Sequence, residues 1–532
     1  MVTQCAARVP HIACAFRAPY ARPARGLKEV LVCPWNSASP VLALADDLSG
    51  AAEVAALLRL PARLELDPAR ARQPPDTPDA LAEWASGSVR TAVVTDLDSR
   101  QADPESAAEA VRALLAGSGP DAFPPRGIPY AEGGTGVAPA QATTATGREP
   151  LLWYKKADSL LRGNVGAEAA AFAEGAEAVV TAMALPGTGR VVREGVVHVQ
   201  GVPLHESGAW RAEGRTAPRS LPEALAPLPT VCLPVGAVRR GARALAGRLK
   251  DAAAQGLHPV CDAETDADLT VIAEAALSLG PGYRLLGSGG LAAALGRIIG
   301  DGTAHDAPTE RIHAAARPLL VVVGSAEPVI RTQIAHLVAA GAHHVTLTPR
   351  SLVNADADLS PNTREHAHAQ GHSPAPARTV FHSGADSDPG SAPAHAPLPS
   401  LAPHAVTVLS IDGADGIRPA QARHLVCGLA RTVAALPGGP DLVLTGGETA
   451  RRVLDALGIT TLRPVGEIHH GAVHCRTPEG RSVVTRPGSF GGPDSLLRIA
   501  TALRPHLLCP PAAPEPSPPK PPTAPPRQGV TQ

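Results

Sequence analysis

The sequence predicts an α/β protein with two doubly wound domains, each built on a mainly parallel sheet, and a cleft between them. Short apolar runs alternate with Ala- and Leu-rich stretches of helical length, and after about residue 318 this alternation starts again. Strand–helix alternation is typical of parallel sheets that helices cover on both faces. The 532 residues leave room for two such domains, at about 100–200 residues per domain.

Four apolar runs in the first half and four in the second predict the strands. In the first half these strands are expected at 41–45, 91–95, 178–180 and 258–261. Helices are expected there at 51–60, 79–85, 107–115 and 165–172. In the second half we expect strands, each with a helical segment beyond it, at 319–324, 344–348, 405–411 and 441–446.

Shifts in composition set the expected domain boundaries. They predict a first domain at 39–300, a linker at 301–317 and a second domain at 318–502. Three segments are expected outside any core: an irregular extension at 1–38, a disordered insertion at 353–404 and a disordered Pro-rich tail at 503–532. The first 28 residues contain four arginines and no acid, so a targeting peptide is an alternative to a disordered extension or a misplaced start codon.

Composition excludes several classes of protein. The net charge of −1 argues against a nucleic-acid binder, and no apolar run is long enough for a membrane span. Eight cysteines without a CxxC pair disfavour a disulfide scaffold or zinc ribbon and favour a cytoplasmic protein. We interpret the histidines of 353–404 as compositional drift, so no metal site is expected in this segment. The P-loop, GxSxG and HExxH patterns are absent from the sequence.

Three loops of the first half carry polar residues directly after predicted strands, where open α/β sheets bind ligands. Asp46-Asp47 suits the hydroxyls of a polyol or a general base, although a helix cap explains Asp47 equally well. Arg100 offers a planar fork for a carboxylate. Lys155-Lys156 holds two of the five lysines in the chain, next to Asp158. Together these loops favour a small hydroxylated carboxylate as ligand.

Three glycine-containing turns of the second half favour a nucleotide. They are Gly324-Ser325, the segment TGGET at 445–449 and the segment GSFGG at 488–492. Glycine lets backbone N–H groups approach phosphate oxygens at the start of a helix. A further turn, GSGGLA at 287–292, superficially fits a dinucleotide fingerprint, but we interpret it as a packing turn because no acid follows at the required spacing.

In this order, the loops resemble the four-carbon acid sugar kinase family. The matching segments are ADDLSGA (45–51), DSR (98–100), KKADSLLRGN (155–164), PGTGRVVREGVVHVQGVPLHES (186–207), GS (324–325), GGET (446–449) and GSFGG (488–492). The resemblance implies a two-lobed kinase whose domain at 39–300 is a sugar-acid substrate-binding domain and whose domain at 318–502 is a nucleotide-binding domain. It implies that this kinase uses ATP and Mg²⁺ to phosphorylate the terminal hydroxyl of threonate, erythronate or 3-oxo-tetronate. We also expect a cytoplasmic protein with no nucleic-acid or membrane partner, and a homodimer is an option.

The resemblance also implies roles for individual residues. Substrate contacts are expected from Asp46, Asp47, Arg100, Lys155, Lys156 and Asp158. Nucleotide contacts are expected from Ser325, Gly446, Gly447, Glu448, Thr449, Gly488 and Gly491. Our hypothesis is that Asp47 acts as the catalytic base while Arg100 or the lysine pair anchors the substrate carboxylate.

Two departures from the family pattern leave alternatives open. Ala52-Glu53 stands where the family has Asn-Asp, and Arg486-Pro487 stands where it has Lys-Ser. Arg486 can still meet a phosphate, but Pro487 removes a backbone donor. The alternative to an active kinase is a catalytically reduced paralogue that binds a sugar acid or a nucleotide. A dehydrogenase or a scaffolding protein explains fewer of the loops.

Overall fold

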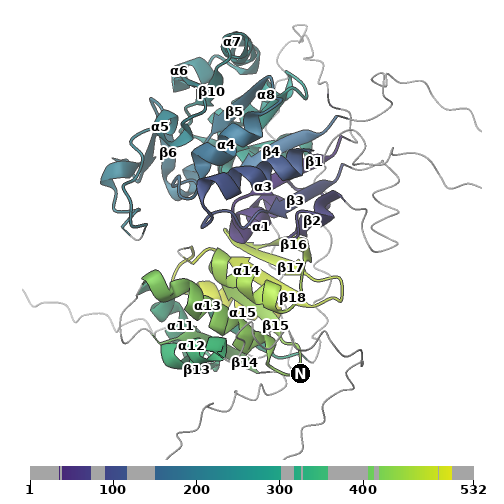
Figure 1. The fold of residues 1–532 in the computed structure, drawn as a ribbon, viewed down its shortest axis with the longest axis vertical. Coiled ribbons are helices and arrows are strands. Elements are labelled where there is room, and N and C mark those ends of the chain that lie inside the picture. Colours follow the sequence, from purple (N-terminus) through teal and green to yellow (C-terminus); the bar gives the residue numbers. More distant parts are fainter. Residues whose placement is uncertain are drawn as a thin grey trace, which may run out of the picture. The chain divides into compact units, whose positions relative to one another are not determined.

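A computed structural model describes most of both predicted domains (Figure 1). It describes residues 35, 39–72, 90–116, 150–211, 213–300, 317–324, 328–357, 405–412, 419–488, 490–505 and 508. The predicted helix at 79–85 lies outside these residues. No helix among the described residues is long and apolar enough to cross a membrane.

The first half forms a parallel sheet with the strand order β2–β3–β1–β4–β11–β5–β10–β9. The strands are β1 (Val41–Ala45), β2 (Ala62–Glu65), β3 (Ala92–Asp96), β4 (Leu152–Lys156), β5 (Ala178–Ala182), β9 (Thr230–Leu233), β10 (His258–Cys261) and β11 (Tyr283–Gly287). The helices are α1 (Leu48–Leu57), α3 (Pro104–Ala116), α4 (Val165–Ala173), α5 (Leu221–Leu225), α6 (Val235–Val238), α7 (Ala242–Ala254), α8 (Asp266–Leu277) and α9 (Gly289–Ile299). A small antiparallel sheet contains β6 (Arg190–Arg193), β7 (Val196–Val199) and β8 (Val202–Pro203).

The second half has the strand order β13–β14–β12–β15–β18–β17–β16, in which the last two pairings are antiparallel. The strands are β12 (Leu319–Val323), β13 (His343–Leu347), β14 (Val406–Ile411), β15 (Asp441–Thr445), β16 (Thr461–His469), β17 (Ala472–Arg476) and β18 (Ser482–Arg486). The helices are α11 (Pro328–Ala339), α12 (Pro349–Ala357), α13 (Pro419–Ala434), α14 (Gly447–Ala456) and α15 (Ser495–Leu503).

The predicted α/β class with mainly parallel sheets is confirmed, and one further pairing was not predicted. β16 pairs antiparallel with β2, so strands from both halves belong to one 15-stranded sheet. α12 ends at Ala357, which places its last turn inside the predicted insertion at 353–404. The cleft and the homodimer stay predictions.

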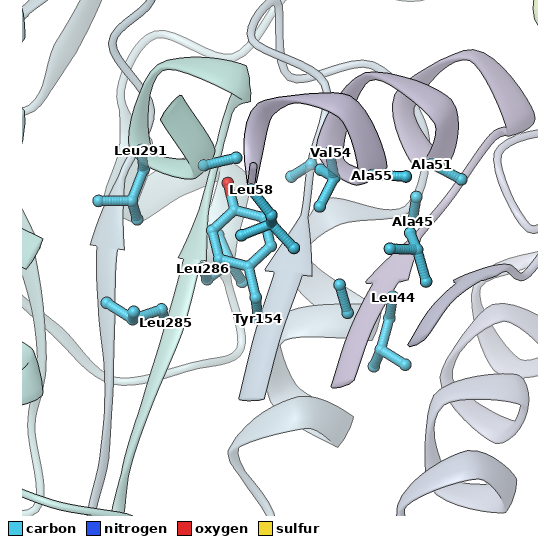
Figure 2. Packing of buried hydrophobic residues seen from close by; sticks show 14 of the residues in the cluster. Leu44, Ala45, Ala51, Val54, Ala55, Leu58, Tyr154, Leu285, Leu286 and Leu291 are labelled. Atoms are coloured by element: carbon cyan, nitrogen blue, oxygen red, sulfur yellow. The ribbon is translucent and has the colours of Figure 1, made fainter. Parts of the chain in front are cut away.

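Small apolar side chains build the core, as the scarcity of aromatic residues requires. Every residue of β1 is buried, because β3 and β4 flank this strand and α1 packs on it. Figure 2 shows part of this core, in which Val54 of α1 and Leu58, directly after this helix, face the strands that carry Leu44 and Tyr154. A fully buried central strand holds the loop that follows it in a fixed position.

Helix α1 begins at Leu48, three residues earlier than predicted, because Asp47 caps it. The Asp47 carboxylate accepts a hydrogen bond from the backbone N–H of Gly50 at 2.9 Å. The cap interpretation of Asp47 is therefore correct, and it leaves the second carboxylate oxygen available for another partner.

Candidate functional site

The three predicted substrate loops meet at one edge of the first sheet. β1 lies between β3 and β4, and Ala45 pairs with both Asp96 and Lys156. Because all three strands are parallel and in this register, their carboxyl ends stand at the same level. The loops after β1, β3 and β4 are thus neighbours in space, although more than 100 residues separate Asp46 from Asp158 in the sequence.

Arg100 connects the two aspartates of the first loop. Its Nε and Nη2 donate to the two carboxylate oxygens of Asp46 at 2.7 and 3.0 Å, and its Nη1 donates to Oδ2 of Asp47 at 2.8 Å. Such a bidentate pair fixes the planes of both groups. The Arg100 guanidinium is therefore already neutralised by protein carboxylates.

The two neighbouring aspartates differ in proton affinity. Burial would raise the pKa of Asp46, but Arg100 and the two lysines of β4 hold it below its ordinary value. The pKa of Asp47 is raised by burial and by the charge of Asp46, against the opposing effect of Arg100. Two adjacent carboxyls whose pKa values are pushed apart suit two different roles, one as a fixed charge and one as a proton acceptor.

Lys155 forms a buried ion pair that the sequence did not reveal. Its side chain has no exposed surface, and its Nζ lies 2.9 Å from Oε2 of Glu168 and 2.9 Å from the carbonyl oxygen of Lys156. The hydroxyl of Ser99 donates to the other oxygen of Glu168. This geometry is that of a residue that holds β4, α4 and the loop after β3 together.

Lys156 pairs with an acid at the position where the sequence departs from the family pattern. Its Nζ lies 3.3 Å from Oε2 of Glu53, and both side chains are nearly buried. The change from Asn-Asp to Ala52-Glu53 thus keeps a carboxylate at this position of α1. Oε1 of Glu53 is buried and has no hydrogen-bond partner.

Asp158 is held by Arg162, four residues further along the same loop. Arg162 donates from Nε and Nη2 to the two oxygens of Asp158 at 2.7 and 3.0 Å, and this pairing helps keep the pKa of Asp158 low despite burial. The loop then needs Gly163, whose φ of +85° favours glycine. A Cβ atom there would lie 3.2 Å from Oδ2 of Asp46.

The second half brings its three candidate loops together in the same way. β15 lies between β12 and β18, with Thr445 paired to both Val323 and Arg486. The turns after these parallel strands are therefore neighbours at the carboxyl edge. Ser325, predicted to contact the nucleotide, lies outside the described residues.

The TGGET turn starts α14 in a crowded environment. Gly446 has a φ of +95°, and its backbone N–H donates to the carbonyl oxygen of Arg486 at 2.8 Å. A Cβ atom at Gly324 would lie 2.2 Å from the hydroxyl of Thr449. The hydroxyl of Thr445 is buried without a hydrogen-bond partner. A glycine turn at the start of a helix lets backbone N–H groups approach a phosphate.

Arg486 points into the protein, whereas the sequence suggested a phosphate contact. The side chain is fully buried, and burial lowers its pKa to about 10. It donates to the carbonyl oxygens of Phe490 at 2.7 Å and Gly488 at 3.3 Å, and to Oε1 of Gln333 at 2.6 Å. Through these hydrogen bonds, Arg486 therefore holds the glycine-rich loop in place from the interior of the protein.

Contacts between residues of the first and second halves were not predicted. Asp96 at the end of β3 accepts from Nη1 of Arg451 at 3.0 Å, and Asp98 accepts from Nη2 of Arg452 at 2.6 Å. A Cβ atom at Gly447 would lie 2.4 Å from Oδ2 of Asp47. The candidate base thus contacts the first residue of the helix that follows the predicted nucleotide turn.

Two further expectations can be compared with the structure. In the GSGGLA turn, a Cβ at Gly289 would lie 2.4 Å from Oε1 of Glu53, and one at Gly290 would lie 2.3 Å from the carbonyl oxygen of Ala184. These contacts fit the interpretation as a packing turn. In the part of the chain that the structure describes, no three His, Cys, Asp or Glu side chains form a metal-binding group.

Comparisons with known proteins identify both halves. A sugar-binding N-terminal domain family matches residues 41–295, and a nucleotide-binding C-terminal domain family matches residues 320–496. The chain is 33% identical to a D-threonate kinase of Cupriavidus necator over 357 residues, 64% of this chain and 78% of the relative. It is 35% identical to a D-threonate kinase of Bordetella bronchiseptica over 364 residues, 66% of this chain and 78% of the relative. A 3-oxo-tetronate kinase of Cupriavidus necator is 27% identical over 363 residues, 63% of this chain and 74% of the relative.

Solved structures share the fold. One, from Salmonella typhimurium and described as a putative tRNA synthase, has a TM-score of 0.57 at 19% identity and covers 86% of this chain and 98% of its own. A Haemophilus influenzae protein has a TM-score of 0.54 at 19% identity, covering 87% of this chain and all of its own, 100%. At this identity the two structures support the fold alone. The two matching domains and the sequence relatives show that the chain belongs to the four-carbon acid sugar kinase family.

Proposed function

We propose that this protein is an ATP-dependent kinase that phosphorylates the terminal hydroxyl of a four-carbon sugar acid of the threonate, erythronate or 3-oxo-tetronate type. The observation that carries the proposal is the contact between Asp47 and Gly447. This contact joins the paired carboxylates of the first half to the start of α14 in the second half. A kinase needs the acceptor hydroxyl and the phosphoryl donor at one place. This contact brings the proposed substrate loop and the proposed nucleotide turn together.

Asp47 is the proposed catalytic base. Its raised pKa makes it a better proton acceptor than an ordinary aspartate, and its Oδ2 faces Arg100 and the start of α14. Asp46 stays ionised beside Arg100 and fixes the guanidinium. In the proposed reaction Asp47 accepts the proton of the terminal hydroxyl as the hydroxyl oxygen bonds to the γ-phosphorus of ATP. The bond between the γ-phosphorus and the β–γ bridging oxygen breaks, and ADP leaves with the electron pair.

The proposed nucleotide site is the set of turns after β12, β15 and β18. Gly446 makes the turn, and the backbone N–H groups from Gly447 to Thr449 open α14 and suit phosphate oxygens, with Gly488 and Gly491 in the neighbouring loop. For Ser325 we keep the nucleotide contact that was expected from the sequence. Glu448, in the first turn of α14, fits a magnesium ion, because magnesium held by phosphates needs only one or two protein carboxylates. The ion would offset the charge of the phosphates.

Lys155, Lys156 and Asp158 take positioning roles in this proposal. Each is engaged by a charged partner of the protein, namely Glu168, Glu53 and Arg162 respectively. The first two pairs join β4 to α4 and to α1, and the third fixes the loop after β4. The site therefore exists before substrate arrives, and little reorganisation is required during the reaction.

The proposal is tested by ADP release from Mg-ATP with a panel of four-carbon acids of both stereochemistries. We expect turnover with at least one acid. Asp47→Asn should lower kcat by about 100-fold or more, the usual range for general-base catalysis, while ATP binding measured by calorimetry persists. The kcat of the wild-type protein should fall as the pH decreases toward the raised pKa of Asp47, because only the ionised carboxylate accepts a proton.

The matched control is Asp251→Asn, which changes an exposed aspartate of α7. This variant should keep wild-type turnover. A folded wild-type protein that binds ATP but releases no ADP with any acid of the panel would instead support the catalytically reduced paralogue.

A further inference from the structure

Arg190 is a cation at the substrate loops that lacks a carboxylate partner among the described residues. Arg100, Lys155, Lys156 and Arg162 each form an ion pair, with partners at 2.7, 2.9, 3.3 and 2.7 Å. No described Asp or Glu oxygen lies within ion-pair distance of the Arg190 guanidinium. Its Nη1 donates instead to the neutral hydroxyl of Ser159, at 2.5 Å.

The backbone holds Arg190 firmly at this place. Arg190 opens β6 directly after a tight turn, and its N–H and C=O both pair with Leu185, at 3.2 and 2.8 Å. Gly189, with a φ of +69°, makes the turn possible. Ser159 belongs to the loop after β4, so the hydrogen bond to Ser159 aims the guanidinium at the same loop that contains Asp158.

The surroundings leave the charge of Arg190 incompletely compensated. Burial lowers the pKa of Arg190, and the charge of Asp158 opposes this only in part because Asp158 is already bound bidentately by Arg162. The ring of Phe490, in the glycine-rich loop, covers the guanidinium with 5.7 Å between Cζ and the ring centre. Among the described residues, Nε and Nη2 of Arg190 have no acceptor. A half-buried guanidinium in this state is suited to an anion supplied from outside the protein.

We propose that Arg190 binds the carboxylate of the sugar-acid substrate, with Ser159 orienting its guanidinium. This inference rests on the proposed function and replaces Arg100 and the lysine pair as the carboxylate anchor, since their charges are already neutralised within the protein. Arg190 then selects acids over neutral polyols of the same length. Because the carboxylate and the reacting hydroxyl lie at opposite ends of a four-carbon acid, the contact is made equally in the ground state and the transition state.

The test is the kinetics of Arg190→Gln with the acid that the wild-type protein turns over, at varied acid and varied ATP concentrations. We expect KM for the acid to rise about 30-fold or more, as for truncation of one partner of a buried charge pair. The kcat should change much less, and KM for ATP should stay unchanged. Arg190→Lys should recover part of the loss, because it keeps the charge but not the planar fork.

The matched control is Arg193→Gln on the same strand, which removes only an exposed ion pair with Glu264. This variant should keep the wild-type KM for the acid. An unchanged KM for the acid in Arg190→Gln, or a rise in KM for ATP alone, would overturn the assignment. The second of these outcomes would make Arg190 a phosphate contact instead.

Two further measurements keep the inference decidable. If Arg190→Gln does not fold, Ser159→Ala leaves the arginine in place, and it should raise KM for the acid with kcat retained. An unchanged KM there would count against the role of this pair.

If the wild-type protein releases no ADP with any acid, the proposed function fails, and calorimetry with the same acids decides about Arg190 separately. Binding that is lost in Arg190→Gln supports the inference, whereas equal binding or no wild-type binding overturns it.

Discussion

A Cβ atom added to Gly447 would lie 2.4 Å from Oδ2 of Asp47, so the first residue of α14 and the proposed base are in direct contact. The same atom would lie 3.0 Å from the hydroxyl of Ser49, which is buried and has no hydrogen-bond partner. Asp47 caps α1, and Ser49 lies in the first turn of this helix. The absence of a side chain at Gly447 therefore determines how closely the loop after β1 approaches the loop after β15.

Gly447→Ala should reduce turnover without unfolding the protein. The added methyl group must displace Asp47 or the start of α14, and a shift of about 1 Å in a catalytic group costs on the order of 100-fold in rate. We expect kcat to fall by about that factor, with the thermal unfolding midpoint nearly unchanged, measured by ADP release and by scanning calorimetry.

Gly247→Ala is the control for this substitution. Gly247 lies on the exposed side of α7, and its Cβ would meet no atom within 4 Å. This variant should keep full activity and gain about 0.5–1 kcal/mol of stability from the better helix former. Wild-type kcat in Gly447→Ala would show that the contact with Asp47 has no part in the reaction.

Lys155→Met should affect stability more than substrate affinity. The substitution leaves the Glu168 carboxylate buried without its cation, which lowers the free energy of unfolding by about 3–5 kcal/mol. The double variant Lys155→Met/Glu168→Leu removes both charges and should recover most of this loss. Urea unfolding of the three proteins measures the difference.

The exposed Lys250 of α7 provides a matched lysine control. Lys250→Met should leave the free energy of unfolding within about 0.5 kcal/mol of wild type. If Lys155→Met unfolds at the wild-type urea concentration but has a raised KM for the acid, Lys155 is a direct substrate contact and the positioning role is wrong.

The strands that carry the site could be predicted from the sequence because they are buried on both faces. β1 is a continuous apolar run and β15 has an apolar centre, so the strands and the loops after them can be located from composition. The grouping of the loops also follows, because the carboxyl ends of parallel strands share one edge. Asp46 and Arg100 belong to two of these loops, but their pairing with each other was not predicted.

The partners of the charged residues could not be predicted in the same way. Glu168 lies on α4 and Glu53 on α1, and which lysine each one meets depends on how the helices pack on the sheet. The pairing of β16 with β2 joins residues almost 400 positions apart, and no local pattern specifies it. The side chain of Arg486 points into the protein because it donates to Gln333, which is also far away in the sequence.

Asp96 should make the stability of the protein depend on pH between about 4 and 7. Burial raises the pKa of Asp96 from 3.8 to about 7, against the opposing charge of Arg451. Between these values the folded protein keeps a proton that the unfolded chain has lost. The free energy of unfolding therefore decreases as the pH rises through this range, by up to about 1.4 kcal/mol per pH unit from this group.

Asp96→Asn removes this titration and should show a flatter dependence of unfolding free energy on pH from 4 to 7. Urea unfolding at four pH values in this range, with Asp251→Asn as the exposed control, measures the difference between the slopes. Parallel slopes for Asp96→Asn and the wild-type protein would mean that Asp96 is ionised throughout the range and that the Arg451 charge outweighs burial.

Arg486→Gln should weaken ATP binding through the loop that Arg486 supports. The guanidinium donates to the carbonyl oxygens of Phe490 and Gly488 and to Gln333, so its removal leaves these buried acceptors without donors. With each lost hydrogen bond contributing about 0.5–1.5 kcal/mol, we expect KM for ATP to rise about tenfold or more. KM for the acid should stay the same, because this loop belongs to the second half.

Arg463→Gln on β16 is the control, because this arginine is exposed. It should leave both KM values unchanged.

Arg486→Lys separates support of the loop from direct phosphate contact, since lysine keeps the positive charge but not the planar set of donors that bridges three carbonyl groups. If the loop is what matters, the lysine variant retains a raised KM for ATP that does not depend on ionic strength. Full recovery with lysine, accompanied by a strong salt dependence of KM, would instead show that Arg486 turns outward and meets the phosphates when ATP binds.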